Sequence, residues 1–353
     1  MLFFISRVSA AGYASIIEKK DIDMGVIKLK NRVGVSAVAA VCGKKEHDGP
    51  FGCGLDEFCG DDTFGQKTFE AAEAEMTRRC FCHAMRKGGF SEADIGAIFA
   101  GDLMNQCTAS SYGLLPFDIP YFGLFGACST MAEAVMLAAL TVDGGYFGRA
   151  AAIACSHNAT AERQFRAPVE YGGQRTPTAQ WTVTGSGCAI VDGGESPMYI
   201  REVMPGVSVD YGVKDAANMG AAMAPAAAET LLRYFGETGY SPSSFDLILT
   251  GDLGEEGSSL TAELTRRRGL DLGCGYNDFG VMIYRKDQDV HSGGSGCGCS
   301  AAGLAAYLYD EFAKKHVKNA LFIGTGALMS PMALAQGQSI PGIAHLLRFS
   351  AGL

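Results

Sequence analysis

The feature that most constrains the fold of this chain is an internal repeat at a constant offset of 150 residues. Residues 89–103 run from Gly-Phe-Ser to Ile-Phe-Ala-Gly-Asp-Leu, and residues 239–253 run from Gly-Tyr-Ser to Ile-Leu-Thr-Gly-Asp-Leu without a gap. A helical pattern precedes each copy, over 68–87 in the first and 226–235 in the second. A period of this length is too long for a solenoid, so it indicates two fused copies of one α/β domain.

Two more pairs of segments extend the repeat. Residues 126–129, Gly-Ala-Cys-Ser, are echoed by residues 297–300, Cys-Gly-Cys-Ser, and each opens an Ala-rich helical pattern. The short apolar strand 150–153 likewise corresponds to 320–323. We therefore predict two halves related by an approximate two-fold axis, with strands buried under helices.

The boundaries of the halves follow from this repeat. We assign residues 24–192 to the N-terminal half and 193–353 to the C-terminal half. Residues 1–23 lack the strand-like patterning that begins after Met24, and they are too short and broken for a convincing signal peptide. We interpret them as an upstream extension, with Met24 as the natural start.

Cys128 lies where an apolar run ends and an Ala-rich amphipathic pattern begins at Ser129. This pattern predicts a sharp turn from a strand into a helix. A cysteine at a helix N-terminus feels the positive end of the helix dipole and nearby backbone N–H groups, which favour the thiolate. The alternative is that Cys128 is a small buried apolar residue like many other cysteines.

Charge and cysteine usage exclude several classes of function. A formal charge of −9 and a pI near 5.2 argue against nucleic acid or an anionic membrane surface as the main partner. The twelve cysteines are scattered through a large chain, which fits a reducing cytosol better than a disulfide framework. The close pairs Cys80/Cys82 and Cys297/Cys299 have poor spacing for zinc, so we expect no metal and no cofactor.

Several motifs together resemble the thiolase and ketoacyl-synthase superfamily and, within it, the stage V sporulation protein AD family. The resemblance runs from about Met24 to Phe349. It implies an α/β fold of five layers, αβαβα, with mixed sheets and the Cys128 helix at the centre. It also implies a homodimer formed through the first half. The motifs that carry the resemblance are Phe125–Thr130, Ser156–Arg166, Glu170–Gln174, Thr184–Gly187, Met223–Ala227, Leu249–Leu253 and Gly293–Cys297.

The resemblance implies a function in sporulation. The family is known for binding dipicolinic acid, which with calcium fills the core of bacterial endospores, and for acting in its uptake by the developing spore. It implies a cytoplasmic protein, peripheral at the forespore or spore inner membrane, that works with membrane-embedded subunits of an uptake channel. Whether the ligand is free dipicolinic acid or its calcium complex stays open.

The residues around the second-half repeat argue against catalysis. Condensing enzymes carry a histidine at a place that corresponds to Thr250-Gly251-Asp252, and an aspartate there would repel a developing anion. His291 lacks the proline and the pattern of the thiolase histidine segment. We therefore predict a non-catalytic binding protein in which Cys128 is a vestigial nucleophile and its helix N-terminus holds a ligand carboxylate. The alternative is an acyl-CoA-dependent thiolase or ketoacyl-synthase type acyltransferase that uses Cys128.

A planar aromatic dianion needs several donors for its two carboxylates and flat apolar walls. The segment 156–175 is rich in such donors, although its arginines could instead pair with acidic neighbours and its histidine could be a satisfied core residue. Two further candidates follow the repeated strands, Asn105 in the first half and Asp252 in the second. The predicted ligand-binding residues are Cys128, His157, Asn158, Arg163, Gln164, Arg166, Asn105 and Asp252.

Overall fold

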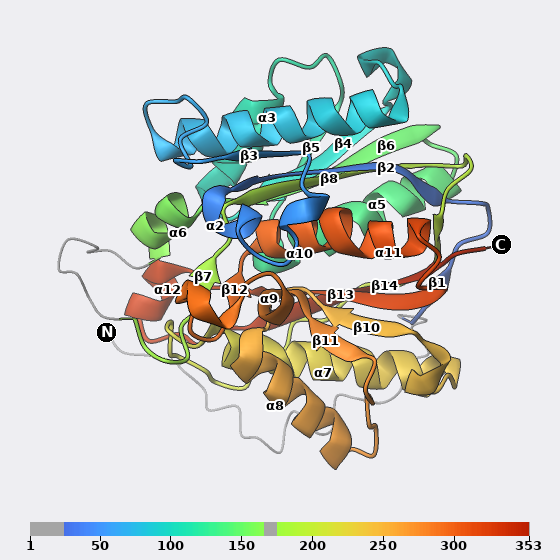
Figure 1. Cartoon of the computed structure of the whole chain (residues 1–353). Helices are drawn as coiled ribbons and strands as arrows, with labels where there is room; N and C mark the ends of the chain where they lie inside the picture. The colour runs from blue at the N-terminus through green and yellow to red at the C-terminus, as the bar shows by residue number, and fades with distance from the viewer. Residues whose placement is uncertain (1–24, 166–174, 353) are drawn as a thin grey trace, which may run out of the picture.

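The structure, a computed structural model, describes residues 25–165 and 175–352. Its layers are stacked in the order helices, sheet, helices, sheet, helices (Figure 1). Helix α3 (Phe69–Gly88) covers one outer face, and α7 (Met219–Thr238) with α8 (Gly254–Arg267) covers the opposite one. The predicted five-layered αβαβα arrangement is therefore confirmed.

The two halves have the same strand order and the same strand directions. In each, the first two neighbouring pairs are parallel and the last two are antiparallel. The first-half order is β5 (Tyr121–Leu124), β4 (Ala97–Asp102), β6 (Arg149–Ser156), β8 (Gly185–Asp192) and β2 (Gly34–Gly43). The second-half order is β11 (Tyr276–Asp278), β10 (Leu247–Thr250), β13 (Asn319–Ala327), β14 (Gly342–Ser350) and β9 (Met198–Met204).

The two sheets are joined at one edge, because β2 pairs with β9 over two residues at Gly34 and Val35. Short strands extend this framework. They are β1 (Ile27–Lys28) beside β9, β3 (Glu57–Cys59) beside β2, and the separate pair β7 (Trp181–Thr182) and β12 (Gly294–Ser295).

Helix α3 begins and ends close to where its sequence predicts. The Thr68 hydroxyl caps the first turn of α3 by accepting the amide N–H of Ala71, and Gly89 ends the helix with φ +69°. Helix α7 ends in the same way at Gly239, with φ +70°. It starts at Met219, earlier than predicted, because Asn218 caps it and the helix continues through Pro225.

Between the sheets lie α5 (Thr130–Asp143) and α10 (Cys297–Gly303), which runs through a π-helical turn (Leu304–Leu308) into α11 (Tyr309–Ala313). Helix α5 packs on strands of both halves. Small residues permit this close approach. A Cβ on Gly324 of β13 would lie 2.4 Å from the Cβ of Ala132 in α5, so a larger residue there would push the layers apart.

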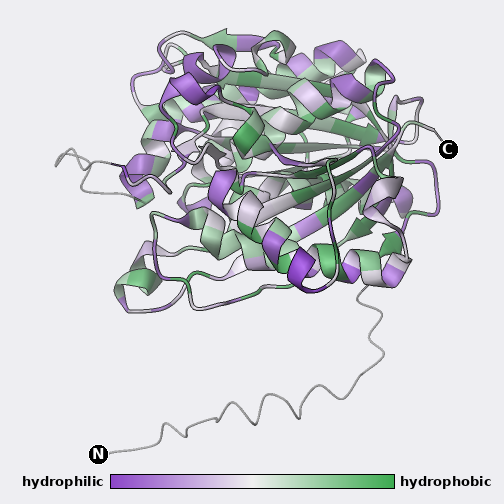
Figure 2. Cartoon of the chain, turned by 60° about the horizontal axis from the view of Figure 1, so that its bottom comes forward, coloured by the Kyte–Doolittle hydropathy of each residue, from purple (hydrophilic) through white to green (hydrophobic). Residues whose placement is uncertain are grey.

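The remaining α-helices of the described ranges are short. They are α2 (Lys44–His47), α4 (Thr108–Leu114), α6 (Asn158–Phe165), α9 (Phe279–Met282) and α12 (Pro331–Ala335). Figure 2 shows hydrophobic strands inside the molecule and more hydrophilic residues on the outer helices. Within the described ranges, no helix combines the length and the apolar character needed to cross a bilayer.

Candidate functional site

Cys128 lies in the turn between β5 and α5, as its sequence context predicts. The turn is a short 3₁₀ segment over Ala127–Ser129, and Ala127 has φ +52°, a left-handed conformation that is unusual for a residue with a side chain. The hydroxyl of Thr130 donates to the carbonyl of Ala127 at 2.7 Å and helps to hold the turn in this shape. The Cys128 side chain is nearly buried and faces a pocket.

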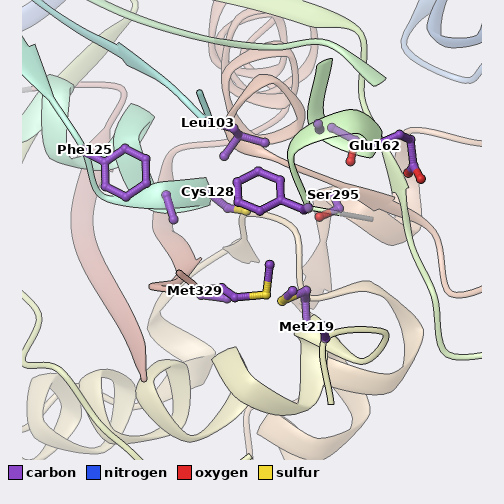
Figure 3. Close-up of a pocket in the computed structure, with 13 residues that line it drawn as sticks. Leu103, Phe125, Cys128, Glu162, Met219, Ser295 and Met329 are labelled. Atoms are coloured by element: carbon purple, nitrogen blue, oxygen red, sulfur yellow. The ribbon is translucent and has the colours of Figure 1, made fainter. Parts of the chain in front are cut away.

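The pocket is narrow, about 60 Å³ in volume, and its wall is mostly apolar. In Figure 3 the thiol of Cys128 lies between Leu103 on one side and Met219 and Met329 on the other. Thr182 and Ser295 contribute hydroxyl groups, and Glu162 is the charged residue among the described residues of the wall. The lining residues are Leu103, Phe125, Ala127, Cys128, Ala161, Glu162, Phe165, Thr182, Ala216, Met219, Ser295, Ala327 and Met329.

Both halves contribute to this wall. Leu103 directly follows β4, and Glu162 lies on α6. Ser295 in β12 and Met219 at the start of α7 come from the second half. The pocket therefore forms only when the two repeats are packed against each other.

Asp252 follows β10 and lies directly behind Cys128. Its carboxylate accepts the amide N–H of Gly296 at 2.7 Å and the hydroxyl of Thr325 at 2.9 Å, and it interacts with the neighbouring thiol of Cys128. Burial raises the pKa of the Asp252 carboxyl to about 7. Burial also raises the pKa of the Cys128 thiol well above 9, and the neighbouring Asp252 charge adds to this increase.

The environment of Cys128 therefore favours the thiol and not the thiolate. The helix N-terminus that could stabilise a thiolate is outweighed by burial and by the acidic neighbour. None of the six histidines, all of which lie in the described ranges, lines the pocket. His291 instead donates from its Nδ1 to the carbonyl of Thr176, 2.7 Å away, and lines a separate open hollow.

His157 lies outside the pocket wall, although its position after β6 suggested a place in the site. Its Nε2 lies 2.9 Å from the carbonyl oxygen of Asp62, and its Nδ1 accepts the amide N–H of Ala159 at 3.1 Å. The ring also packs against Phe69, and the side chain is almost fully buried. Both ring nitrogens are occupied, so His157 serves as a structural residue that holds the turn before α6.

Asn158 and Gln164 stabilise the walls of the pocket from behind. The side-chain amide of Asn158 donates to the carbonyl of Thr182 at 3.3 Å. Gln164 donates to the carbonyl of Leu103 at 3.1 Å, and its side-chain oxygen accepts the amide N–H of Asn105 at 3.1 Å. These residues are brought near the pocket, but their amide groups are used to position its lining.

The arginines expected in the site are not brought to the pocket within the part of the chain that the structure describes. The guanidinium of Arg163 is exposed and pairs with Glu70 of α3. Arg166 lies outside the described residues. The physical reason for the Arg163 placement is helical periodicity, because Ala161 and Glu162 take the positions of α6 that face the pocket.

Sequence reasoning missed the role of the segment around β7. Trp181 and Thr182 alternate across the strand, so Thr182 faces the pocket and Trp181 lines a hollow on the other side. Gln180 donates to the carbonyls of Asp252 and Gly294, at 2.7 and 2.6 Å, and so fixes β12 against the turn after β10. The signal in the sequence that could have pointed to this segment is Trp181, which is the single tryptophan of the chain.

Two cationic side chains lie over the ring of Trp181. The ammonium group of Lys45 lies 4.3 Å from the ring centroid, and the guanidinium carbon of Arg175 lies 4.9 Å from it. Arg175 also pairs with Asp289 at 2.8 Å. No group of three or more His, Cys, Asp or Glu side chains within the described ranges could hold a metal ion.

Comparisons with known proteins place the chain in a sequence family. A sequence model of the family described as Stage V sporulation protein AD matches residues 24–350. Stage V sporulation protein AD of Bacillus subtilis (strain 168) is 40% identical over 311 residues, which cover 88% of this chain and 92% of that protein.

Two solved structures show the same fold at low sequence identity. A variant of OleA from Xanthomonas campestris has a TM-score of 0.57 at 11% identity, covering 92% of this chain and 99% of its own. The 3-oxoacyl-[acyl-carrier-protein] synthase III of Aquifex aeolicus VF5 has a TM-score of 0.55 at 12% identity, covering 90% of this chain and 99% of its own. These likenesses confirm the thiolase-like fold.

Proposed function

The chain belongs to the stage V sporulation protein AD family, and from this premise we propose that it binds dipicolinic acid, or its calcium complex, for uptake into the developing endospore. The pocket beside Cys128 is the proposed binding site. The protein acts as a binding protein that has kept the thiolase-like fold without its chemistry. The family resemblance implies the dipicolinate ligand, and the partly polar pocket beside Cys128 supports the proposed location.

The observation that carries the non-catalytic part of the proposal is the pairing of Cys128 with Asp252. A condensing enzyme needs a thiolate nucleophile and donors that stabilise the developing anion. Here the thiol is buried beside a carboxyl group, and none of the six histidines lines the pocket. The pocket has therefore kept its position in the fold, while its cysteine has lost the surroundings that would activate it.

Part of the pocket wall has the chemistry that a flat aromatic acid needs. Phe125, Phe165, Met219 and Met329 offer apolar surfaces, and the hydroxyls of Thr182 and Ser295 can donate hydrogen bonds to carboxylate oxygens. The pocket is narrow, so the ligand requires it to widen. Methionine side chains adapt easily because they have three rotatable bonds.

The proposal includes a homodimer formed through the edge of the first-half sheet. Strand β5 is the outermost strand of that sheet and exposes Tyr121, Phe122 and the following Phe125. The equivalent edge strand of the second half, β11, exposes Asn277 instead. An unpaired apolar edge favours association, and antiparallel pairing with a second copy would bury these aromatic rings.

The proposal places the protein on the cytoplasmic side of the forespore or spore inner membrane, beside the membrane-embedded subunits of the uptake channel. The family resemblance implies this placement, and the family name supports a role in sporulation. The structure is compatible with a peripheral role, since no described helix has the character of a membrane span.

The experiment that tests the proposal is calorimetric titration of the full chain with dipicolinate, its calcium complex and acetyl-CoA. Ala216 lines the pocket, and Ala217 beside it does not, so Ala216→Trp and Ala217→Trp form a matched pair. We expect Ala216→Trp to reduce dipicolinate binding at least tenfold and Ala217→Trp to leave it within about twofold.

The alternative acyltransferase function predicts a different result. Incubation with acetyl-CoA would then leave an acetyl thioester on Cys128, which mass spectrometry detects as a mass increase on the peptide that contains it. A thioester together with no binding of dipicolinate would overturn the proposed function.

A further inference from the structure

We propose that binding of the dianionic ligand is coupled to the uptake of one proton by the protein, and that the side chain of Asp252 carries this proton. The inference rests on the proposed function, because it concerns how the same pocket tolerates two ligand carboxylates. Asp252 is thus a regulatory residue of the site, which makes ligand affinity depend on pH. The chemical class of ligand is a small aromatic dicarboxylate.

The geometry places Asp252 immediately behind the pocket. Its neighbour Cys128 lines the pocket. Ser295 also lines the pocket, and the next residue, Gly296, donates its amide N–H to the Asp252 carboxylate. The carboxyl group is completely buried, so no solvent screens it from an anion in the pocket. A ligand carboxylate that contacts the thiol would be separated from Asp252 by one side chain.

The groups that face Asp252 from the surrounding elements do not neutralise it. Asp278 at the end of β11 adds a second buried carboxyl, and Cys297 and Cys299 of α10 are neutral thiols. Among the described residues, none of the ion pairs joins a lysine, arginine or histidine to Asp252. These neighbours of Asp252 therefore include a second carboxyl and no cation.

Two anions this close in a buried site cannot both keep their full charge at low cost. The pKa of Asp252 in the empty protein is about 7, so a large fraction of the carboxyl is ionised at neutral pH. A bound dianion raises this pKa further, because it disfavours the charged form of its neighbour. The protein then binds a proton together with the ligand. The ligand itself does not supply the coupling, since carboxylic acids are already ionised above about pH 5.

The protonated form fits the existing hydrogen bonds. The oxygen that accepts the Gly296 amide stays an acceptor, and the other oxygen, 2.9 Å from the Thr325 hydroxyl, can donate because a hydroxyl also accepts. Asparagine has the same shape and the same arrangement of one acceptor and one donor. Asp252→Asn is therefore a close imitation of the neutral acid that cannot titrate.

The test is a titration of the full chain with dipicolinate between pH 6 and pH 9. For the wild type we expect a constant affinity below about pH 7 and a loss that approaches tenfold per pH unit above it. Asp252→Asn should bind with the same affinity across the range. Glu73→Gln is the matched control, because Glu73 is also a buried carboxyl with a raised pKa but lies outside the pocket wall. It should keep the wild-type slope.

A second measurement does not depend on any variant. Calorimetric titration of the wild type at pH 8 in phosphate and in Tris, whose ionisation enthalpies differ, gives the number of protons taken up. We expect a value close to one. Binding without proton uptake, or a pH slope that survives in Asp252→Asn, overturns the coupling and leaves the proposed function intact. Absence of dipicolinate binding at every pH overturns the proposed function itself.

Discussion

The thiol of Cys128 and the carboxyl of Asp252 are buried neighbours, although they follow non-equivalent strands in different halves of the chain. Cys128 follows the edge strand β5 of the first half, and Asp252 follows β10 of the second. The pair lies where the two halves meet behind the pocket. It connects the raised pKa of the Cys128 thiol with the buried carboxyl that an anion in the pocket would approach.

We predict that Cys128 reacts slowly with iodoacetamide at pH 7.5. Its pKa is raised well above 9, so its thiolate fraction is at most a few per cent, and burial hinders access. Cys53 and Cys274 are exposed and should react at least about 100-fold faster. Peptide mass spectrometry over time measures each rate, with urea-unfolded protein as the control in which all cysteines react. Preferential labelling of Cys128 in the folded protein would contradict the non-catalytic interpretation.

We predict that Glu73→Gln removes part of the loss of stability that accompanies a rise from about pH 4 to about pH 8. Glu73 is fully buried, and its pKa is raised to about 8, first by burial and then by the charge of Asp102. The folded state therefore binds more protons than the unfolded state between the unfolded pKa of about 4.3 and the folded value. The wild-type free energy of unfolding falls with rising pH in this window, by at most about 1.4 kcal/mol per unit from this group, and levels off above it.

Urea unfolding of the wild type and Glu73→Gln at pH 5, 6.5 and 8 measures this effect. The stability of the variant relative to the wild type should increase steadily across the series. Gln can still accept the hydroxyl of Thr160, which lies 2.7 Å from the Glu73 carboxylate. Glu255→Gln, at an exposed position, should show no such trend. Equal pH dependence in the wild type and Glu73→Gln would show that Glu73 is ionised in the folded protein at pH 5.

We predict that Gly123→Glu converts the proposed homodimer into monomers. Gly123 lies in the exposed edge strand β5, and a side chain there would meet only the flexible end of Tyr121. Antiparallel pairing about a two-fold axis would bring two such charges close together, which is destabilising. Analytical ultracentrifugation measures the change. Gly148→Glu, at a glycine with open space around it, is the matched control and should stay dimeric. A wild type that sediments as a monomer would refute the homodimer.

We predict that Arg163→Ala changes dipicolinate affinity less than about threefold and stability by less than about 1 kcal/mol. Its guanidinium is exposed and pairs with Glu70, and exposed ion pairs contribute little. Calorimetric titration and thermal unfolding measure the two effects. A large loss of binding with an unchanged melting temperature would instead favour the sequence interpretation, in which the donors of residues 156–175 hold the ligand.

The architecture was largely predictable from the sequence, because its signals are local and occur twice. The repeat around Asp102 and Asp252 predicted two copies of one unit, and each copy has the same strand order. Thr68 and Gly89 predicted the ends of α3, because a hydroxyl cap and a left-handed glycine act within one turn. The place of Cys128 before α5 followed from a similar change of pattern.

The side chains that line the pocket could not be predicted from local patterns in the same way. His157, Arg163 and Gln164 are close in sequence to a strand end, but their partners are Asp62, Glu70 and Leu103, which come from other elements. No local pattern indicates which donors will already be used by a distant carbonyl or carboxylate. The residue types alone indicated side chains that can donate hydrogen bonds to a ligand. Tertiary packing decided which of these side chains face the pocket.

By itself, the sequence determined the two-fold α/β plan, the turn that holds Cys128, and the aspartate that stands in the place of a histidine. Only the tertiary structure decided that this aspartate contacts the thiol, and that burial keeps the thiol protonated. Helix ends and strand patterns depend on neighbours along the chain. A pKa depends on the solvent and charges that surround a group in space, and these exist only once the two halves are packed together.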